Sequence, residues 1–561
     1  MKFFILLFLL INNGKIIRDE KLLPKFMTDE EILKSFEIGK YLQKGPPPSY
    51  PVRTHAEYER VQCVFFRWPY SSSWNYIWRE MIREVSEVTK AYIITAYPSD
   101  TTSIKNYLLQ GGVNIDSVRF FIVSTNSVWI RDYGPWSIYV ENGSLSIIDF
   151  IYNRPRPQDD SFPSKLGQAW NLPVYLPDLV HPGGNFMVDG NGVGFSTELI
   201  YQENNLTPSQ IAQIMKDYLG LEKFVVVPRI LYEYTGHIDI FAKILNDTLV
   251  MVGKYDNPND PNYARLNQIA DSISHVQNLD GKYFKVVRII MPESFSPSHT
   301  TGATYLNSLF VNGKILVPIY GLPQDPEALQ VYQQALPDYE VIGINCSAMV
   351  GSGGAIHCVT MGFAPKDFLP PEVIHNPLQD TSISYWPLTV FAEVFDNLKV
   401  YRVYLIYNIN HQDSTMLRML KVENTDSFYR EFEGNVNVGD SIFYRILAID
   451  GAFNKTYLPQ NGYFAFKIKP ETQVSEKRKD NKVKVYFSNK TLFISSNDED
   501  DLNLYLYDIS GRKLLNFKIL IEKGIKKINL SNLKNGTYFL KLKSKNYDGK
   551  FKFLNLKGGN K

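Results

Sequence analysis

The sequence predicts an α/β protein in its front part, followed by two smaller units built from β-strands. Between residues 50 and 365, apolar strands alternate with helical patterns, which is typical of α/β folds. An apolar strand that leads to a polar or glycine-containing turn recurs about five times in this stretch. Such recurrence favours a propeller or a solenoid. From residue 378 onward, helical periodicity is weak and short strands are separated by turn residues, as in a β-sandwich.

Bulk composition agrees with a multidomain globular protein. The chain has 561 residues, and domains usually hold about 100–200 residues, so three or more domains are expected. Hydrophobic residues make up 44% of the chain, which is enough for ordinary packed cores. The net charge is only +2, whereas nucleic-acid binding calls for a basic face. We therefore expect no nucleic-acid partner, and we predict a monomer.

Residues 1–18 are predicted to be a signal peptide. Lys2 precedes an unbroken apolar run from Phe3 to Ile11, which gives the basic and hydrophobic regions of a secretory signal. The run is too short to span a bilayer, and no later segment is long and apolar enough to do so. The exported protein is therefore expected to be soluble. The alternative for this run is a buried N-terminal strand.

Residues 19–49 form a separate N-terminal stretch. Thr28 and Glu31 have the spacing of a capping box, and they predict a short helix that ends near Gln43. The run Lys-Gly-Pro-Pro-Pro at 44–48 then breaks the helix. The sequence leaves open whether this stretch is a propeptide or a packed arm.

The front domain, residues 50–365, is predicted to hold the alternating strands and helices. Helical patterns cover residues 73–90, 208–218 and 260–272. The predicted strands share an apolar run bounded by polar or glycine residues, and they are 63–66, 91–96, 120–124, 224–227, 249–252, 285–291, 308–311 and 341–344.

Two smaller units follow, separated by linkers at 365–377 and 470–482. Residues 378–469 predict an immunoglobulin-like β-sandwich without a cluster of catalytic residues. Residues 483–561 predict a small C-terminal β domain. The strands expected in the sandwich are 388–394, 401–407, 416–422, 441–448 and 463–468.

Three phrases in the last unit, at 504–512, 533–541 and 550–554, resemble the C-terminal sorting domain of type IX secretion substrates. This resemblance implies export across an outer membrane, a secreted or cell-surface location, and contact with the secretion machinery. The alternative is an additional β-sandwich that has no role in secretion.

Cysteine usage points to a reactive thiol. The chain has only Cys63, Cys346 and Cys358, and an odd number leaves at least one thiol unpaired in an exported protein. Cys358 follows the glycine-rich run 351–354, and such loops let the backbone approach a ligand closely. Its thiolate would be a competent nucleophile. The structural alternative is a Cys346–Cys358 disulfide.

Two polar clusters upstream suit a planar cation. A guanidinium ion carries a forked set of donors that carboxylates match, and its burial is tolerable only between opposite charges. Asp132 and Asp239 supply such charges. If residues 236–239 enter a strand, His237 and Asp239 point to the same face. A histidine there can act as general acid and base near neutral pH.

The two carboxylates should also affect the pKa of the Cys358 thiol. Like charges disfavour ionisation, so Asp132 and Asp239 should raise the pKa of Cys358 in the empty cavity. We expect the arriving cation to lower that pKa and to promote formation of the thiolate.

Four motifs together resemble the guanidine-modifying enzyme superfamily, and within it the agmatine deiminases and the secreted peptidylarginine deiminases of bacteria. The resemblance covers roughly residues 50–365 and implies a five-bladed α/β propeller, the pentein fold, around a central site. The motifs are Trp-Ile-Arg-Asp-Tyr-Gly-Pro at 129–135, His-Pro-Gly-Gly-Asn at 181–185, Gly-His-Ile-Asp at 236–239 and Gly-Gly-Ala-Ile-His-Cys at 353–358.

The resemblance also implies roles for single residues. Cys358 would be the nucleophile and His237 the general acid and base, while Asp132 and Asp239 would bind the guanidinium group. Asn307 matches an additional active-site asparagine. Trp129 and Tyr234 match residues that flank and cover the arginine side chain; ordinary packed aromatics are the alternative for them.

Arg154 and Arg156 match a pair that holds the terminal carboxylate of a peptide substrate. Their forked donors complement a carboxylate, and agmatine has none. A solvated basic loop is the alternative for this pair. The resemblance therefore implies hydrolytic deimination of arginine, preferentially C-terminal arginine of peptides and proteins. The products would be citrulline and ammonia, formed through a covalent thiouronium intermediate on the cysteine.

This reaction needs no metal or organic cofactor. No Cys/His spacing matches a zinc site and no EF-hand-like loop occurs, so we expect calcium independence, with incidental cation binding left open. Three other functions stay open from the sequence. They are deimination of agmatine or free arginine, a papain-like thiol hydrolase without the expected signature around its cysteine, and a non-enzymatic surface adhesin.

Overall fold

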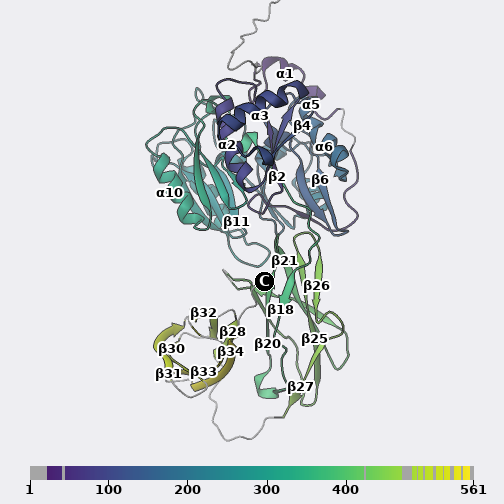
Figure 1. Ribbon diagram of the computed structural model, residues 1–561, viewed down its shortest axis with the longest axis vertical. Helices are drawn as coiled ribbons and strands as arrows, with labels where there is room; N and C mark the ends of the chain where they lie inside the picture. Colours follow the sequence, from purple (N-terminus) through teal and green to yellow (C-terminus); the bar gives the residue numbers. More distant parts are fainter. Residues whose placement is uncertain are drawn as a thin grey trace, which may run out of the picture. The chain divides into compact units, whose positions relative to one another are not determined.

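The computed structural model describes residues 20, 22–40, 44–422, 425–470, 483–488, 491–496, 500–508, 513–521, 524–530, 533, 536–544 and 548–555 (Figure 1). The predicted signal peptide and most of the second linker lie outside these residues. The chain divides into two compact units. Unit 1 contains residues 1–370, 397–401 and 449–454, and unit 2 contains residues 371–396, 402–448 and 455–561.

Within its described residues, unit 1 holds five separate sheets, and each sheet combines parallel with antiparallel pairs. This alternation confirms the α/β class, whereas the five-bladed arrangement stays a prediction. The sheets are β1-β5-β6-β7 (Val52–Thr54, Trp136–Val140, Ser144–Ile148, Val174–Tyr175), β10-β9-β8 (Lys223–Val227, Val193–Thr197, Met187–Val188), β11-β12-β13 (Ala242–Asn246, Leu249–Lys254, Lys285–Ile290), β14-β15-β16 (Leu309–Val311, Lys314–Ile319, Glu340–Asn345) and β17-β2-β3-β4 (Met361–Phe363, Cys63–Arg67, Lys90–Thr95, Val118–Ile122).

The pairing of β17 with β2 joins the end of the front domain to its beginning. Phe363 lies opposite Cys63 and Met361 opposite Phe65 in this antiparallel pair. Residues far apart in the chain therefore share one sheet, and the loop that carries Cys358 leads directly into β17.

The helices of unit 1 follow the local rules of capping and amphipathicity. In α8 (Pro208–Leu219), Thr207 and Gln210 form a capping box and the helix ends at Gly220, whose φ of 70° suits glycine. Its buried side chains Ile211 and Met215 lie four residues apart on one face. The longer helices also include α2 (Asn75–Val88), which packs on β3, and α3 (Thr101–Gln110), α6 (Phe162–Trp170), α9 (Tyr263–Ser274) and α10 (Asp325–Ala335) (Figure 1).

The predicted strands and helices of the front domain are all present, with shifts of a few residues at their ends. The strand β4, for example, begins at Val118 rather than 120 because Val118 pairs with Ala91 of β3. The prediction omitted the β5–β6 hairpin, although Asn142-Gly143 between two apolar runs is a strong hairpin signal.

The N-terminal stretch is folded in its described part. The Thr28–Glu31 capping box is confirmed, since the Thr28 hydroxyl accepts from the Glu31 backbone N–H and the Glu31 carboxylate accepts from Thr28 N. The helix α1 (Asp29–Leu33) is shorter than expected. A 3₁₀ turn, η1 (Ser35–Glu37), follows it instead of a continuation toward residue 43.

Unit 2 consists of β-strands, and its immunoglobulin-like topology stays a prediction. Four of the five strands expected in the sandwich are present, whereas the one expected at 416–422 is divided into β22 and β23, which belong to different sheets. The strands β18, β19, β24 and β26 were not predicted. Among the described residues, no helix is both long and apolar enough to cross a membrane. The sheets are β18-β20-β24-β23 (Glu372–Ile374, Thr389–Phe395, Ser427–Glu431, Leu420–Lys421), β19-β27-β25-β21-β22 (Thr381–Ser382, Phe464–Lys469, Ser441–Asp450, Val400–Ile409, Thr415–Arg418) with β26 (Lys455–Leu458) on β25, β28-β29-β32 (Val483–Ser488, Thr491–Ser496, Gly524–Asn529) and β31-β30-β33-β34 (Lys513–Ile521, Asp500–Asp508, Gly536–Lys543, Asp548–Asn555).

Candidate active site

Three of the candidate catalytic residues lie on short helical turns between the strands of unit 1. Asp132 lies in α4 (Ile130–Tyr133), Asp239 in η5 (Ile238–Ile240) and Cys358 in η7 (His357–Val359). The turn η4 (Gly183–Asn185) contacts both α4 and η5, and α4 also contacts η7. Loops from separate sheets thus bring these residues to one place.

Cys358 is a free thiol at the centre of this cluster. All three cysteines are free, so the alternative of a Cys346–Cys358 disulfide is wrong. Cys358 is 0% exposed, and its thiol donates to Asp239 Oδ2 at 3.7 Å. Burial and the negative charge of Asp239 raise the pKa of Cys358 to about 12. This direction agrees with the effect predicted for nearby carboxylates.

Asn307 joins the nucleophile to one of the acids. Its Nδ2 donates to Asp239 Oδ2 at 3.0 Å and to Cys358 Sγ at 3.2 Å. Its Oδ1 accepts from the backbone N–H groups of Ala355 and Cys358 at 3.1 and 3.3 Å. Asn307 therefore fixes both the turn of Cys358 and the carboxylate beside it.

Asp239 remains ionised despite its burial. Burial alone would raise the pKa of this carboxyl, but the charge of Lys25 and the hydrogen bond from His357 hold it well below its usual range. The expectation that residues 236–239 enter a strand was wrong. His237 has extended backbone, whereas Asp239 lies in a 3₁₀ turn.

His237 and Asp132 lie side by side in the same cluster. His237 is 0% exposed, and its Nδ1 lies 3.5 Å from Asp132 Oδ1. Burial and the positive charge of Lys25 lower the pKa of His237 well below its usual range. Burial raises the pKa of Asp132, although its Oδ1 accepts a hydrogen bond from Gly184 N at 3.2 Å. The imidazole is therefore neutral while Lys25 is in place.

Gly184 lies between these groups without a side chain. A Cβ atom at this position would lie 2.6 Å from His237 Nδ1, 2.7 Å from Asp132 Oδ1 and 3.2 Å from Asp239 Oδ2. The motif at 181–185 therefore carries a steric requirement of the site, which the sequence had left without a role.

We expect Gly184→Ala to lower kcat by about 10²-fold, because displacing catalytic groups by about 1 Å can cost that much. Steady-state kinetics measures the effect, and a thermal melt checks the fold. Gly351→Ala is the matched control, since no atom lies within 4 Å of the added Cβ. Equal activity of the two variants would show that His237 and Asp132 do not need this spacing.

A chain of buried charges behind Asp239 was missed from the sequence. His357 lies between two carboxylates, with Nδ1 2.7 Å from Asp239 Oδ2 and Nε2 2.6 Å from Glu57 Oε2. Lys243 Nζ in turn donates to Glu57 Oε1 at 2.6 Å. The nearby His357, Lys243 and Arg131 hold the pKa of Glu57 well below its usual range against the effect of burial. His357 thus orients Asp239, and only its place beside Cys358 hinted at such a role.

The N-terminal stretch enters the cavity through Lys25. Lys25 is 0% exposed; its Nζ donates to Cys358 Sγ at 2.9 Å and lies 3.8 Å from Asp132 Oδ2. Burial opposes its charge, but Asp132, Cys358 and Asp239 together hold the pKa of Lys25 above its usual range. A lysine ammonium therefore occupies the space between the candidate catalytic groups.

The remaining candidate residues hold the backbone of this stretch. Arg154 Nε donates to the Lys25 carbonyl at 3.1 Å. Arg156 donates to the Glu31 carboxylate through Nε at 2.7 Å and through Nη2 at 3.1 Å. Both arginines are buried, so the alternative of a solvated basic loop is wrong.

The two candidate aromatic residues contact the same stretch. Trp129 is fully buried, and its Nε1 donates to the Leu23 carbonyl at 3.0 Å. A Cβ added to Gly354 would lie 2.9 Å from Trp129 Cζ3 and 2.8 Å from Cys358 Sγ, so Gly354 lies close to both the indole and the thiol. Tyr234 is 44% exposed and packs its ring 5.0 Å from that of Phe26.

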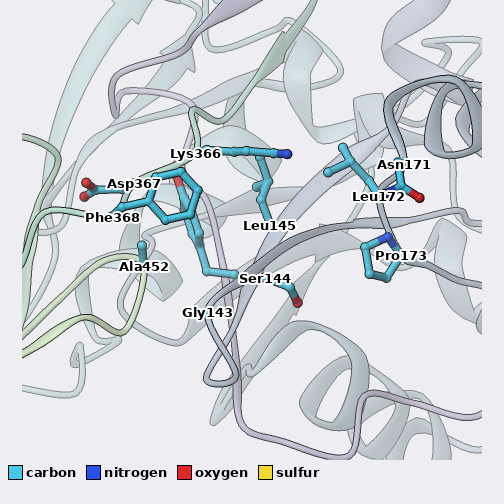
Figure 2. Close-up of a pocket in the computed structure, with 11 residues that line it drawn as sticks. Gly143, Ser144, Leu145, Asn171, Leu172, Pro173, Lys366, Asp367, Phe368 and Ala452 are labelled. Atoms are coloured by element: carbon cyan, nitrogen blue, oxygen red, sulfur yellow. The ribbon is translucent and has the colours of Figure 1, made fainter.

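A surface hollow of about 140 Å³ lies elsewhere on unit 1 (Figure 2). Figure 2 shows it lined by residues 143–145, 171–173 and 366–368, together with Ala452. None of the candidate catalytic residues is among its lining residues. Its lining residues offer neither a thiol nor an imidazole.

Comparisons with known proteins match two parts of the chain. Residues 53–363 match the model of the Porphyromonas-type peptidyl-arginine deiminase family, and residues 488–554 match the secretion system C-terminal sorting domain. The agmatine deiminase of Pseudomonas syringae pv. tomato is 28% identical over 284 residues, covering 44% of this chain and 77% of the relative. That of Pseudomonas putida is 28% identical over 280 residues, covering 44% and 76%.

A solved structure gives the fold. The chain is similar to the agmatine deiminase of Enterococcus faecalis with a TM-score of 0.51 and 22% identity, covering 58% of this chain and all of that enzyme. The front part of the chain therefore has the pentein-like fold of these deiminases.

Proposed function

The chain belongs to the Porphyromonas-type peptidyl-arginine deiminase family, and we propose that it deiminates arginine at the C-terminus of peptides and proteins. Membership supports hydrolysis of a guanidino group as the reaction; the choice of C-terminal arginine is the proposal. The C-terminal sorting domain indicates export to the cell surface or the medium through the secretion machinery.

In this proposal Asp132 and Asp239 hold the guanidinium group while Cys358 attacks its carbon. Two buried carboxylates offset the cost of bringing a planar cation into the cavity. Their negative charge keeps the thiol protonated until a cation arrives. Asn307 and His357 orient Asp239 and the cysteine turn.

The reaction then proceeds in two halves. His237 takes the thiol proton as the Cys358 sulfur forms a C–S bond with the guanidinium carbon, and it passes that proton to the leaving nitrogen as the C–N bond breaks and ammonia departs. The resulting thiouronium is attacked by water that His237 deprotonates. The C–S bond breaks, and citrulline leaves with the thiolate restored. Besides the substrate and water, these steps use only side chains of the chain itself.

The spacing between Arg154 and Cys358 supports a peptide substrate. Lys25 reaches Cys358 Sγ with its Nζ at 2.9 Å while its own carbonyl accepts from Arg154 Nε at 3.1 Å. A C-terminal arginine of the same reach would present its carboxylate to Arg154. Arg156, which holds the Glu31 carboxylate with two donors, offers a second partner for that anion.

A substrate panel tests this proposal. A short peptide ending in arginine, its C-terminal amide, a peptide with internal arginine, and agmatine are incubated with the protein and with its Lys25→Ala variant. Mass spectrometry should detect citrulline first and fastest in the peptide with the free carboxylate. Faster turnover of agmatine would favour the activity named for the Pseudomonas relatives, and peptide cleavage without ammonia would point to a thiol hydrolase. No citrulline from any compound would favour the adhesin.

In the Lys25→Ala variant, in which no ammonium lies beside Cys358, adding Arg156→Ala should raise KM for the C-terminal arginine peptide by about 10–100-fold, because a bidentate charged contact is worth about 1.5–3 kcal/mol. Turnover of agmatine should change little, since agmatine has no carboxylate. Arg119→Ala, at an exposed arginine that donates to the backbone of Asp116, is the control. An equal loss on both substrates would remove the carboxylate-binding role from Arg156.

A further inference from the structure

The N-terminal stretch contacts the candidate site at several successive backbone groups rather than through Lys25 alone. The Leu23 carbonyl accepts from Trp129, the Lys25 N–H donates to the Ser352 carbonyl at 3.1 Å, and Arg156 Nη2 donates to the carbonyls of Pro24 and Phe26 at 2.8 and 3.2 Å. Contacts to successive backbone groups are the way an enzyme holds a peptide substrate.

The side chain of Lys25 reproduces the reach of an arginine. The ammonium nitrogen of lysine and the guanidinium carbon of arginine are separated from Cα by the same number of bonds. Lys25 Nζ, 2.9 Å from Cys358 Sγ, therefore lies where the electrophilic carbon of a substrate would be attacked. An ammonium has no such carbon, so this cation binds and cannot react.

Glu31 resembles the carboxylate of a bound substrate. Its carboxylate accepts hydrogen bonds from both Nε and Nη2 of Arg156, while the capping box of α1 fixes Glu31 in place. A substrate carboxylate would need the same donors. The stretch thus occupies the cation position and also competes for the carboxylate position.

We propose that residues 22–37 are a pseudosubstrate that keeps the enzyme latent by placing Lys25 between Asp132, Asp239 and Cys358. This inference rests on the proposed function of that site, because it assigns how the same site is regulated. Displacement or proteolytic removal of the stretch opens the cavity to an arginine side chain. The stretch is tethered, so it competes at a high effective concentration without being supplied from outside.

The first test measures access to the cavity without deimination. 2-Chloroacetamidine carries a planar amidinium cation, and the Cys358 sulfur displaces its chloride, forming a C–S bond as the C–Cl bond breaks. We expect Lys25→Ala to be alkylated at Cys358 at least tenfold faster than the unaltered chain, because reactivity follows the fraction of open molecules. Peptide mass spectrometry identifies the modified residue.

Two variants accompany this measurement. Lys34→Ala removes an exposed lysine of the same stretch, which forms an ion pair with Glu30, and should react like the unaltered chain. Lys25→Met keeps most of the apolar stem and loses the charge, so it should react like Lys25→Ala even if the alanine variant is poorly folded. Equal alkylation rates in all four proteins would overturn the inference.

A second test uses the near-identity of the two cations. In Lys25→Arg the guanidinium carbon takes the place of Nζ, and water should convert residue 25 to citrulline with release of ammonia. Digestion and mass spectrometry should show NH replaced by O at residue 25, and the change should be absent when Cys358→Ala is added. If the introduced arginine stays unmodified in a Lys25→Arg protein that deiminates added peptides, the pseudosubstrate is contradicted.

The two tests separate this inference from the proposed function. Faster alkylation of Lys25→Ala with no citrulline from any arginine compound would overturn the proposed reaction and leave Lys25 as the occupant of the cavity. Equal rates of citrulline formation by the unaltered chain and Lys25→Ala, with equal alkylation, would overturn latency and leave the reaction standing.

Discussion

Cys358→Ala is expected to abolish deimination, with kcat lowered by about 10⁴-fold or more, as for removal of the nucleophile from other covalent enzymes. The reason is chemical: without sulfur, no C–S bond to the guanidinium carbon can form. The loss should be the same whether Lys25 is present or replaced by alanine. Citrulline formation from a peptide ending in arginine measures it.

Cys63→Ala provides the control for this result. Cys63 is also a fully buried free thiol, and burial raises its pKa, but it lies in β2 and is not among the contacts of Asp132, Asp239 or His237. Its replacement should cost about 1 kcal/mol of stability and leave kcat unchanged. Citrulline formation by Cys358→Ala would point to another nucleophile.

Asp239→Asn is expected to lower kcat/KM by about 10²–10⁴-fold. This carboxylate is proposed to meet the substrate cation, and removing one partner of a buried charge pair costs about 3–5 kcal/mol. Its Oδ2 also accepts from Asn307 and His357, and an asparagine keeps these two bonds only if its single amide oxygen takes the position of Oδ2. Kinetics with C-terminal arginine peptides and with agmatine should show the loss on both substrates.

Asp149→Asn is the matched control for that variant. Asp149 is equally buried, but burial raises its pKa to about 8, so near neutral pH its carboxyl is largely protonated and asparagine replaces it closely. Its activity should stay near that of the unaltered chain. If both variants lost activity equally, a general effect of buried carboxylates on the fold would account for the result.

Regular elements were predictable because their signals are local. The α8 capping box, the glycine after it and the four-residue spacing of its buried side chains all lie within one short window. The register of β4 was less predictable, because pairing with β3 decides where the strand begins. Local patterns in the sequence also left open how the five sheets of unit 1 pair their strands, since β17 and β2 meet across almost the whole front domain.

For the site too, residues in local motifs could be predicted from the sequence, whereas residues that only the fold brings there could not. Cys358, His237 and the two aspartates stand in recognisable motifs, and the fold brings them together. Glu57 and Lys243 gave no such signal, since they reach Asp239 only through His357. Lys25 could not be predicted as a site residue for the same reason. The local sequence Leu-Leu-Pro-Lys-Phe does not indicate that the Lys25 ammonium contacts a thiol more than 300 positions away in the chain.

Trapping of the covalent intermediate tests the central claim most directly. Lys25→Ala is mixed with a peptide ending in arginine, quenched in acid within the first turnovers, digested and analysed by mass spectrometry. The peptide that contains Cys358 should gain the mass of the substrate less ammonia, and replacing Asp132 or Asp239 by asparagine should diminish that species. Citrulline appearing in solution while Cys358 stays unmodified at every quench time would contradict attack by sulfur on a guanidinium held between the two acids.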